Sequence, residues 1–163
     1  MSRETKYSVW VFLFLVIAVL CAAIKSAHAD HLTAGFGPSL NGNTNPKYFS
    51  LGYEDMFSQS GSLLFQCGIF FEDVANVGNC SAVLSLRVQT PSGLFMRIGA
   101  GPGAITRTDD RLSSILEANI RYALGVTAFG CDVGFEGSHW SNAGFVPPNL
   151  GRDFIGGFVG IHL

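Results

Sequence analysis

Three residue types that together can hydrolyse an ester lie close to one another near the end of the sequence. His139 and Ser141 are two positions apart, and Asp153 follows the serine by twelve residues. A serine hydroxyl becomes an effective nucleophile when a neighbouring histidine removes its proton. A carboxylate can orient that histidine and stabilise its cation. If the two segments form one hairpin, the sequence predicts a nucleophile, a base and an acid at a single site.

Two asparagines in the same stretch are candidates for a supporting role. Asn142 and Asn149, together with backbone amides, are the donors that we expect to stabilise an oxyanion or to position a substrate. The spacing also fits a second interpretation, a polar rim at a membrane interface with Trp140 as an aromatic-belt residue. No metal-ligand cluster is evident in the sequence, so we expect neither a metal nor another cofactor.

The elements that must position these residues are predicted to be β-strands. Apolar residues fall at every second position in segments of roughly ten residues, a pattern typical of strands with two unlike faces. Clusters of Asn, Gly, Ser and Pro at 41–46, 58–61, 76–79 and 91–93, and the stretch 106–111, separate these segments. The eight predicted strands are 32–38, 47–56, 62–72, 81–90, 93–104, 114–129, 131–141 and 152–163.

The polar face of these strands decides between two all-β architectures. It carries four arginines and five carboxylates: Arg87, Arg97, Arg121, Arg152, Glu54, Glu72, Glu117, Asp132 and Glu136. In a soluble sandwich this face would meet water, whereas in a small barrel the charges would pair in the interior and the apolar face would meet lipid. The near balance of charge and the use of arginine alone favour the barrel. We therefore predict an eight-stranded antiparallel transmembrane β-barrel with a filled interior; a soluble, ligand-binding sandwich is the alternative.

The first part of the sequence predicts export. Arg3 and Lys6 precede an apolar run at 9–24, and Ala27-His28-Ala29 is a small-x-small cleavage signal. We expect a cleaved signal peptide at 1–29 and a barrel at 30–163; an uncleaved anchor helix is the alternative. The predicted mature part has few charges and no basic stripe, which makes nucleic acid an improbable partner.

Strand parity then places the candidate site on the apolar face. His139 and Ser141 share the parity of Val133 and Phe135, while Asp153 shares that of Ile155. If the N-terminus is periplasmic, the hairpin that holds them opens at the cell surface. Polar groups are costly in lipid, but hydrolysis of a lipid ester would require them there.

The motif around these residues resembles a known family. The segment 139–144, His-Trp-Ser-Asn-Ala-Gly, followed by Pro148-Asn149, Gly151 and Asp153, resembles the PagL-type lipid A 3-O-deacylases, which are outer-membrane acyl-ester hydrolases. The resemblance implies an eight-stranded barrel in the outer membrane of a Gram-negative bacterium, with a catalytic triad on its lipid-facing surface. It makes His139 the base and Ser141 the nucleophile, and Asn142 and Asn149 match the motif asparagines. Asp153 stands where the family has a glutamate, one methylene longer.

The activity that the resemblance implies is hydrolysis of the ester-linked acyl chain at position 3 of lipid A. The substrate would be lipopolysaccharide among the lipids of the outer membrane, and no cofactor would be needed. The alternative that we retain is a non-enzymatic outer-membrane barrel with a structural or adhesion role.

The remaining cysteines and histidines support no further site in the sequence. Cys67, Cys80 and Cys131 are an odd number, and Cys67 has the parity of the apolar face, so we assign no disulfide. His162 has interior parity, which predicts a partnership with an interior carboxylate. His31 is expected to be solvated near the mature N-terminus.

Overall fold

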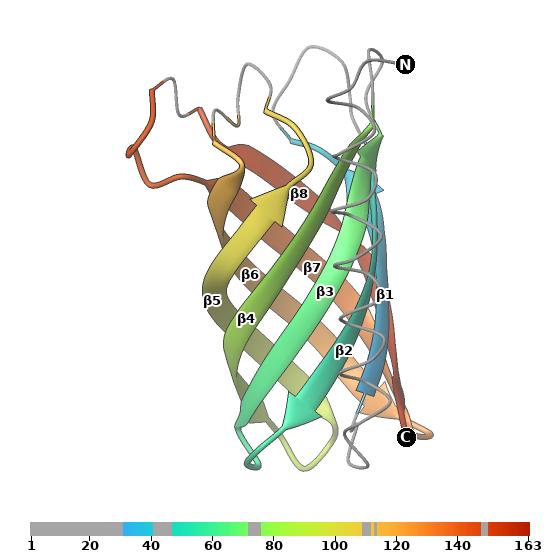
Figure 1. Ribbon diagram of the computed structural model, residues 1–163. Helices are drawn as coiled ribbons and strands as arrows, with labels where there is room; N and C mark the ends of the chain where they lie inside the picture. The colour runs from blue at the N-terminus through green and yellow to red at the C-terminus, as the bar shows by residue number, and fades with distance from the viewer. Residues whose placement is uncertain (1–30, 41–46, 72–75, 109–111, 113, 148–149) are drawn as a thin grey trace.

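The computed structural model describes residues 31–40, 47–71, 76–108, 112, 114–147 and 150–163 (Figure 1). The predicted signal peptide and its cleavage site, the predicted turn at 41–46, Glu72 and residues 109–111 lie outside the described residues. Among the described residues, no helix is long and apolar enough to cross a membrane.

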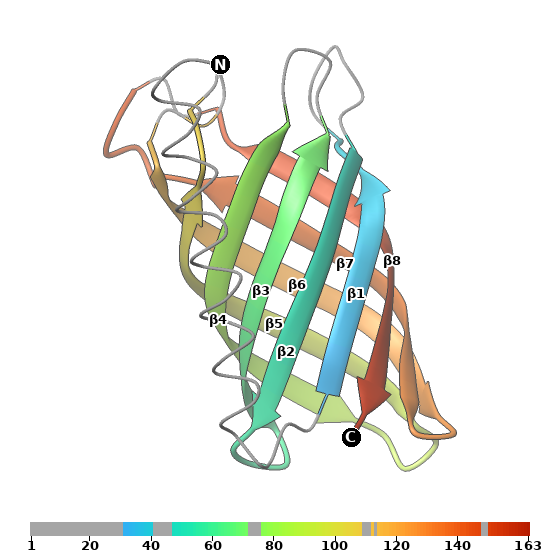
Figure 2. The ribbon, with the colours of Figure 1, turned by 45° about the vertical axis from the view of Figure 1, so that its right-hand side comes forward.

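Eight antiparallel strands form one closed barrel (Figures 1 and 2). Each strand pairs with the next in sequence, and β8 pairs with β1, so that the ring has no free edge. The strands are β1 His31–Pro38, β2 Lys47–Met56, β3 Gly61–Phe71, β4 Val77–Gln89, β5 Leu94–Ile105, β6 Leu116–Ala128, β7 Cys131–Ser141 and β8 Arg152–His162. The predicted closed, eight-stranded antiparallel barrel is confirmed.

The two ends of the barrel differ in the length of their connections. At one end, here called the turn end, strands are joined by the short segments 57–60, 90–93 and 129–130, and β1 begins beside the end of β8 (Figure 2). At the other, the loop end, segments such as 106–115 and 142–151 are longer. Phe129 and Gly130 both have positive φ, 54° and 74°, which suits a two-residue hairpin turn between twisted strands.

Side chains alternate between the interior and the outer surface along each strand, as the sequence predicts. In β6, for example, Leu124 is exposed on the outside while Arg121 and Ala123 are buried inside. The outer surface is rich in large apolar residues, and Phe135 in β7 is 71% exposed. The apolar face of the sequence is therefore the outer face of the barrel.

The predicted pairing of arginines with carboxylates occurs in the interior. Three ion pairs bridge the barrel: Arg87–Asp132, Arg97–Glu54 and Arg121–Glu136. All six side chains are almost fully buried, so each charge depends on its partner for the solvation it has lost. These pairs fix the interior positions of β2, β4, β5, β6 and β7 relative to one another.

An apolar cluster fills the interior toward the loop end. Its members are Tyr48, Phe70, Val77, Ile105, Leu112, Trp140 and Phe154. Phe70 stacks on Phe154 with a centroid distance of 4.6 Å and meets the edge of Trp140. Trp140 is only 3% exposed, so the interpretation of this residue as part of an aromatic belt is wrong. It belongs to the cluster under the site.

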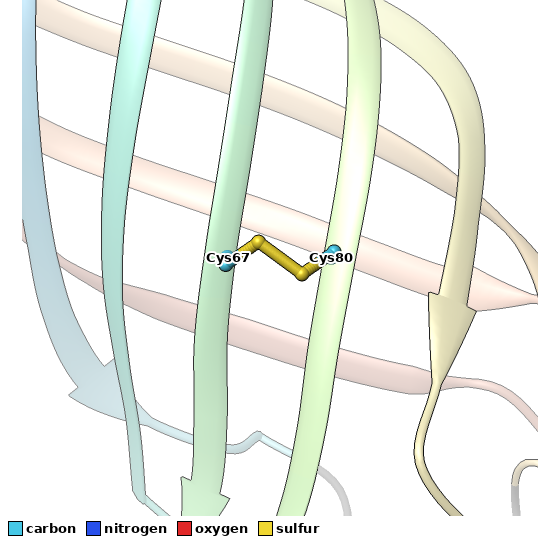
Figure 3. Close-up of a disulfide and its surroundings, with 2 residues drawn as sticks. All are labelled: Cys67 and Cys80. Atoms are coloured by element: carbon cyan, nitrogen blue, oxygen red, sulfur yellow. A yellow bond between two sulfur atoms is a disulfide. The ribbon is translucent and has the colours of Figure 1, made fainter. Parts of the chain in front are cut away.

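Strand β4 begins earlier than predicted, and this difference explains a disulfide that the sequence did not predict. The segment 76–79 has the composition of a turn, yet Val77 and Asn79 are buried and pair with β3. Cys80 therefore lies within a strand, opposite Cys67, with the Cα atoms 4.0 Å apart. The two form a disulfide that joins β3 to β4 (Figure 3). Cys131 is the free cysteine among the described residues.

Candidate active site

Strand register brings the predicted base and acid together. His139 in β7 lies directly opposite Asp153 in β8, and its Nδ1 is 2.7 Å from Asp153 Oδ1. An ionised carboxylate only accepts hydrogen bonds, so Nδ1 must carry a proton in this contact. In the neutral ring, Nε2 then keeps its lone pair and can accept a proton from another group.

The pair lies on the outer surface near the loop end, where β7 ends and β8 begins. The side chains of His139 and Asp153 are 39% and 41% exposed. Their neighbours on this face are apolar: Ile120 is the register partner of His139, and Ile155 is the next outward residue of β8. The pair is thus accessible from outside the barrel, within an apolar surface.

Ser141 ends β7 two residues after His139, on the same face. Residues i and i+2 of a strand are about 7 Å apart, a gap that an imidazole and a hydroxyl can close by side-chain rotation. The hydrogen bond that the structure gives to Ser141 Oγ comes from the amide of Ala143, at 3.3 Å. Among the described residues, no hydrogen bond joins Ser141 to His139. Catalytic hydrogen bonds are often long without substrate and shorten in the complex.

The predicted supporting residue Asn142 shapes the loop that follows the serine. Its side chain is buried, its Nδ2 donates to the carbonyl of Val146 at 2.8 Å, and its Oδ1 accepts from the amide of Gly144 at 2.9 Å. Ala143 and Gly144 both have positive φ. Asn142 thus holds a tight turn that directs the Ala143 amide at Ser141. Asn149 and Pro148 lie outside the described residues.

Gly151 provides the space that His139 occupies. A Cβ atom at this position would lie 2.7 Å from Cε1 of His139, and the residue has a φ of +66°. Both the contact and the backbone conformation require glycine. The sequence motif includes Gly151, but its role becomes visible only when β8 is placed beside β7.

A second group of titratable residues lies in the interior at the turn end. His31 stacks on His162, and His162 Nε2 is 3.1 Å from Asp132 Oδ1. The prediction of an interior carboxylate partner for His162 is confirmed. The prediction for His31 is wrong, because its ring is buried between β8 and the interior charges. With Asp132 they form the one group among the described residues whose ligand atoms are close enough together to hold a metal ion.

Comparison with known proteins shows which family and which fold the chain resembles. The family model described as Lipid A 3-O-deacylase (PagL) matches residues 76–162, which is more than half of the chain. The matched segment contains β4 to β8. No curated protein matches the sequence. The crystal structure of the outer membrane enzyme PagL has a TM-score of 0.65 and 23% sequence identity, covering 82% of this chain and 99% of that chain. The match to the family model shows that this chain belongs to the lipid A 3-O-deacylase family.

Proposed function

We propose that this protein removes the ester-linked acyl chain at position 3 of lipid A, with Ser141 as nucleophile, His139 as base and Asp153 as the acid of a catalytic triad. The observation that carries the proposal is the 2.7 Å contact between His139 and Asp153 on the outer surface, with Ser141 two residues away on the same face. The family to which the chain belongs acts on the same substrate.

The proposed setting is the outer membrane of a Gram-negative bacterium. After cleavage of residues 1–29, the barrel at 30–163 would insert with its apolar surface in the lipid and its loop end at the cell surface. Short turns on the periplasmic side and longer loops outside are the usual arrangement of such barrels. The site would then lie in the outer leaflet, at the depth where lipid A carries its ester bonds.

The chemistry follows from the positions of the three side chains. His139 Nε2 takes the proton of Ser141 as Oγ attacks the ester carbonyl carbon, and Asp153 stabilises the imidazolium that results. Breakage of the ester C–O bond leaves the acyl group on Ser141, and His139 gives its proton to the departing 3-oxygen of the sugar, which leaves as a hydroxyl. Water, activated by the same histidine, then hydrolyses the acyl-enzyme and releases the fatty acid.

The negative charge that develops on the carbonyl oxygen needs donors close to Ser141. The amide of Ala143 already points at Ser141 Oγ, and backbone amides are effective oxyanion donors because they are fixed in place. Asn142 supports this arrangement by holding the turn. Asn142 and Asn149 are themselves the further candidates for donors to the oxyanion.

Mass spectrometry of lipid A from Gram-negative cells that express the chain tests the proposal. We expect the parent to remove one 3-hydroxyacyl chain, and the Ser141→Ala and His139→Ala variants to remove none. Ser138→Ala is the matched control, because this serine lies on the same strand but is buried in the interior. Full deacylation by the Ser141→Ala variant would overturn the assignment of the nucleophile.

A non-enzymatic structural or adhesion role is the second candidate. The observation in its favour is that Ser141 and His139 make no hydrogen bond with each other among the described residues. This candidate predicts unchanged lipid A from a barrel that is shown to be folded in the outer membrane, so the same experiment separates the two.

A further inference from the structure

The backbone carbonyl of Asp153 accepts two hydrogen bonds from the two residues that follow β1. The amide of Leu40 donates to it at 2.9 Å, and the hydroxyl of Ser39 donates to it at 3.0 Å. A carbonyl oxygen has two lone pairs, so this one acceptor can serve both donors. Strands β1 and β8 run side by side (Figure 2). The two contacts join them at the residue that supplies the acid of the candidate site.

These contacts lie beyond the point where the regular pairing of β1 with β8 stops. The ladder ends at Phe36, which lies opposite Gly157. Alternate amides of a strand point to the same neighbour, so the amide at position 38 would point to β8 as that of Leu40 does. Pro38 has no amide hydrogen to donate. Ser39 and Leu40 therefore attach the first residues of β8 to the end of β1 across this gap.

The start of β8 is also fixed from two other directions. Phe154, the residue after Asp153, is fully buried in the apolar cluster and stacks on Phe70. An isolated bridge pairs Phe154 with Ser39. On the other side lies β7, with His139 opposite Asp153. The backbone of Asp153 is thus held from the interior, from β7 and from the end of β1.

The short side chain of aspartate makes this backbone position important. A single methylene separates the carboxylate from Cα, so the carboxylate follows any movement of the backbone closely. Oδ1 of Asp153 is 2.7 Å from Nδ1 of His139, and the two side chains are 41% and 39% exposed. Side chains that are this exposed have little packing around them to correct a displacement. A shift of β8 away from β7 would therefore lengthen the contact directly.

We propose that Ser39 is a positioning residue of the candidate site, whose hydroxyl holds the carbonyl of Asp153 and thereby keeps the carboxylate within reach of His139. Ser39 is 8% exposed and faces the interior, so it acts through Asp153 and does not touch the substrate. It makes closure of the barrel, in which β1 meets β8, a condition of full activity. The inference rests on the proposed function, but the contact that it concerns can be measured without substrate.

The rate of fatty-acid release from lipopolysaccharide tests the proposal in the exported, folded barrel. We expect Ser39→Ala to lower kcat about tenfold and to leave KM near that of the parent, because it shifts the acid by less than the 1 Å that costs on the order of a hundredfold. In an Asp153→Glu background the same change should lower kcat less than about threefold, because the longer side chain can follow the imidazole and the two effects are then coupled. A hydroxyl that only supports the fold would cost the same factor in both backgrounds.

A measurement without substrate separates this test from that of the proposed function. Nuclear magnetic resonance of the barrel with labelled histidines records the proton on His139 Nδ1, which moves downfield when a carboxylate holds it in a short hydrogen bond. The His139→Ala variant identifies this signal by its absence. We expect the downfield signal in the parent, its loss or an upfield shift in Ser39→Ala, and its return when Asp153→Glu is added.

Ser85→Ala is the matched control, because this serine is also buried in the interior but lies on β4, which contributes no residue to the site. We expect the kcat and the His139 signal of the parent, and heat-modifiable migration shows that each variant is folded. An unchanged signal and kcat in Ser39→Ala, or an equal loss of kcat with and without Asp153→Glu, would overturn the proposal. If the parent releases no fatty acid, the proposed function fails, and the His139 signal still decides whether Ser39 holds the acid.

Discussion

Strands β7 and β8 hold two histidine–aspartate pairs, one at each end of the barrel. At the loop end His139 meets Asp153 at 2.7 Å on the outer surface, and at the turn end His162 meets Asp132 at 3.1 Å in the interior. The outer pair lies among apolar side chains, close to a serine. The inner pair is tied to Arg87 and Thr127.

The difference shows that the surroundings determine what such a pair can do. In the outer pair, one ring nitrogen is engaged by the carboxylate and the other is free to exchange a proton with a nucleophile or a substrate. In the inner pair, an arginine neutralises the carboxylate and a second imidazole covers the ring. The first arrangement suits proton transfer, and the second suits the joining of strands.

The largest expected effect is the loss of activity when the outer carboxylate is neutralised. Asp153→Asn should lower kcat by about a thousandfold or more, because an asparagine cannot stabilise the imidazolium and favours the wrong tautomer. The measurement is the rate of release of fatty acid from lipopolysaccharide. Asp153→Glu is the matched variant, and it should keep most of the activity because the family has glutamate here. Equal activity of the asparagine variant and the parent would remove Asp153 from the mechanism.

A smaller effect is expected from Gly151→Ala, which should push His139 away from its position. The new Cβ would lie 2.7 Å from the imidazole, and a displacement of about 1 Å in a catalytic group costs on the order of a hundredfold in rate. Gly144→Ala is the control, since it also has positive φ but its Cβ would meet nothing within 4 Å. The comparison separates backbone strain from the clash. If both variants lose the same activity, strain alone is responsible.

The inner pair should reveal itself in stability. Asp132→Asn removes the charge that compensates buried Arg87, and such a loss costs about 3 kcal/mol. Asp153→Asn, at a half-exposed pair, should cost less than about 1 kcal/mol. Unfolding in denaturant, followed by loss of the heat-modifiable migration typical of barrels, measures both. The reverse order of the two variants would contradict the roles assigned here to the two pairs.

The smallest effect on function is expected at the disulfide between β3 and β4. Replacing Cys67 and Cys80 with serine should lower the free energy of unfolding by about 2–3 kcal/mol and leave the rate of deacylation near that of the parent, because neither strand contributes to the site. Cys131→Ser is the control and should change neither quantity. The stability difference should also appear when the parent is compared with and without a reductant.

The alternation of apolar and polar residues was sufficient to predict the number of strands and the face of most strand residues, and the balance of arginines and carboxylates on one face favoured the closed fold. The same alternation also gives the position of Trp140, because a residue between two outward side chains must face inward. Composition was misleading at 76–79, where a turn-like sequence continues β4 since Val77 is packed in the interior. That early start places Cys80 opposite Cys67.

Contacts between distant strands could not be predicted from the sequence. His31 and His162 are neighbours only because the first and last strands pair in one particular register. The contact between His139 and Asp153 was predictable because both lie in one hairpin with a recognisable motif. The function of Asn142 in holding a turn required the loop conformation, which no periodicity describes.

Covalent labelling of Ser141 shows whether this serine is an activated nucleophile. A fluorophosphonate, which reacts with serines activated by a neighbouring base, is added to the folded, active barrel in detergent, and peptides are analysed by mass spectrometry. We expect modification at Ser141 together with loss of activity, and no labelling in the Ser141→Ala or His139→Ala variants. Two results would contradict the role of Ser141 as nucleophile. One is loss of activity that follows the modification of another residue. The other is an active protein in which every reactive serine is labelled and Ser141 is not.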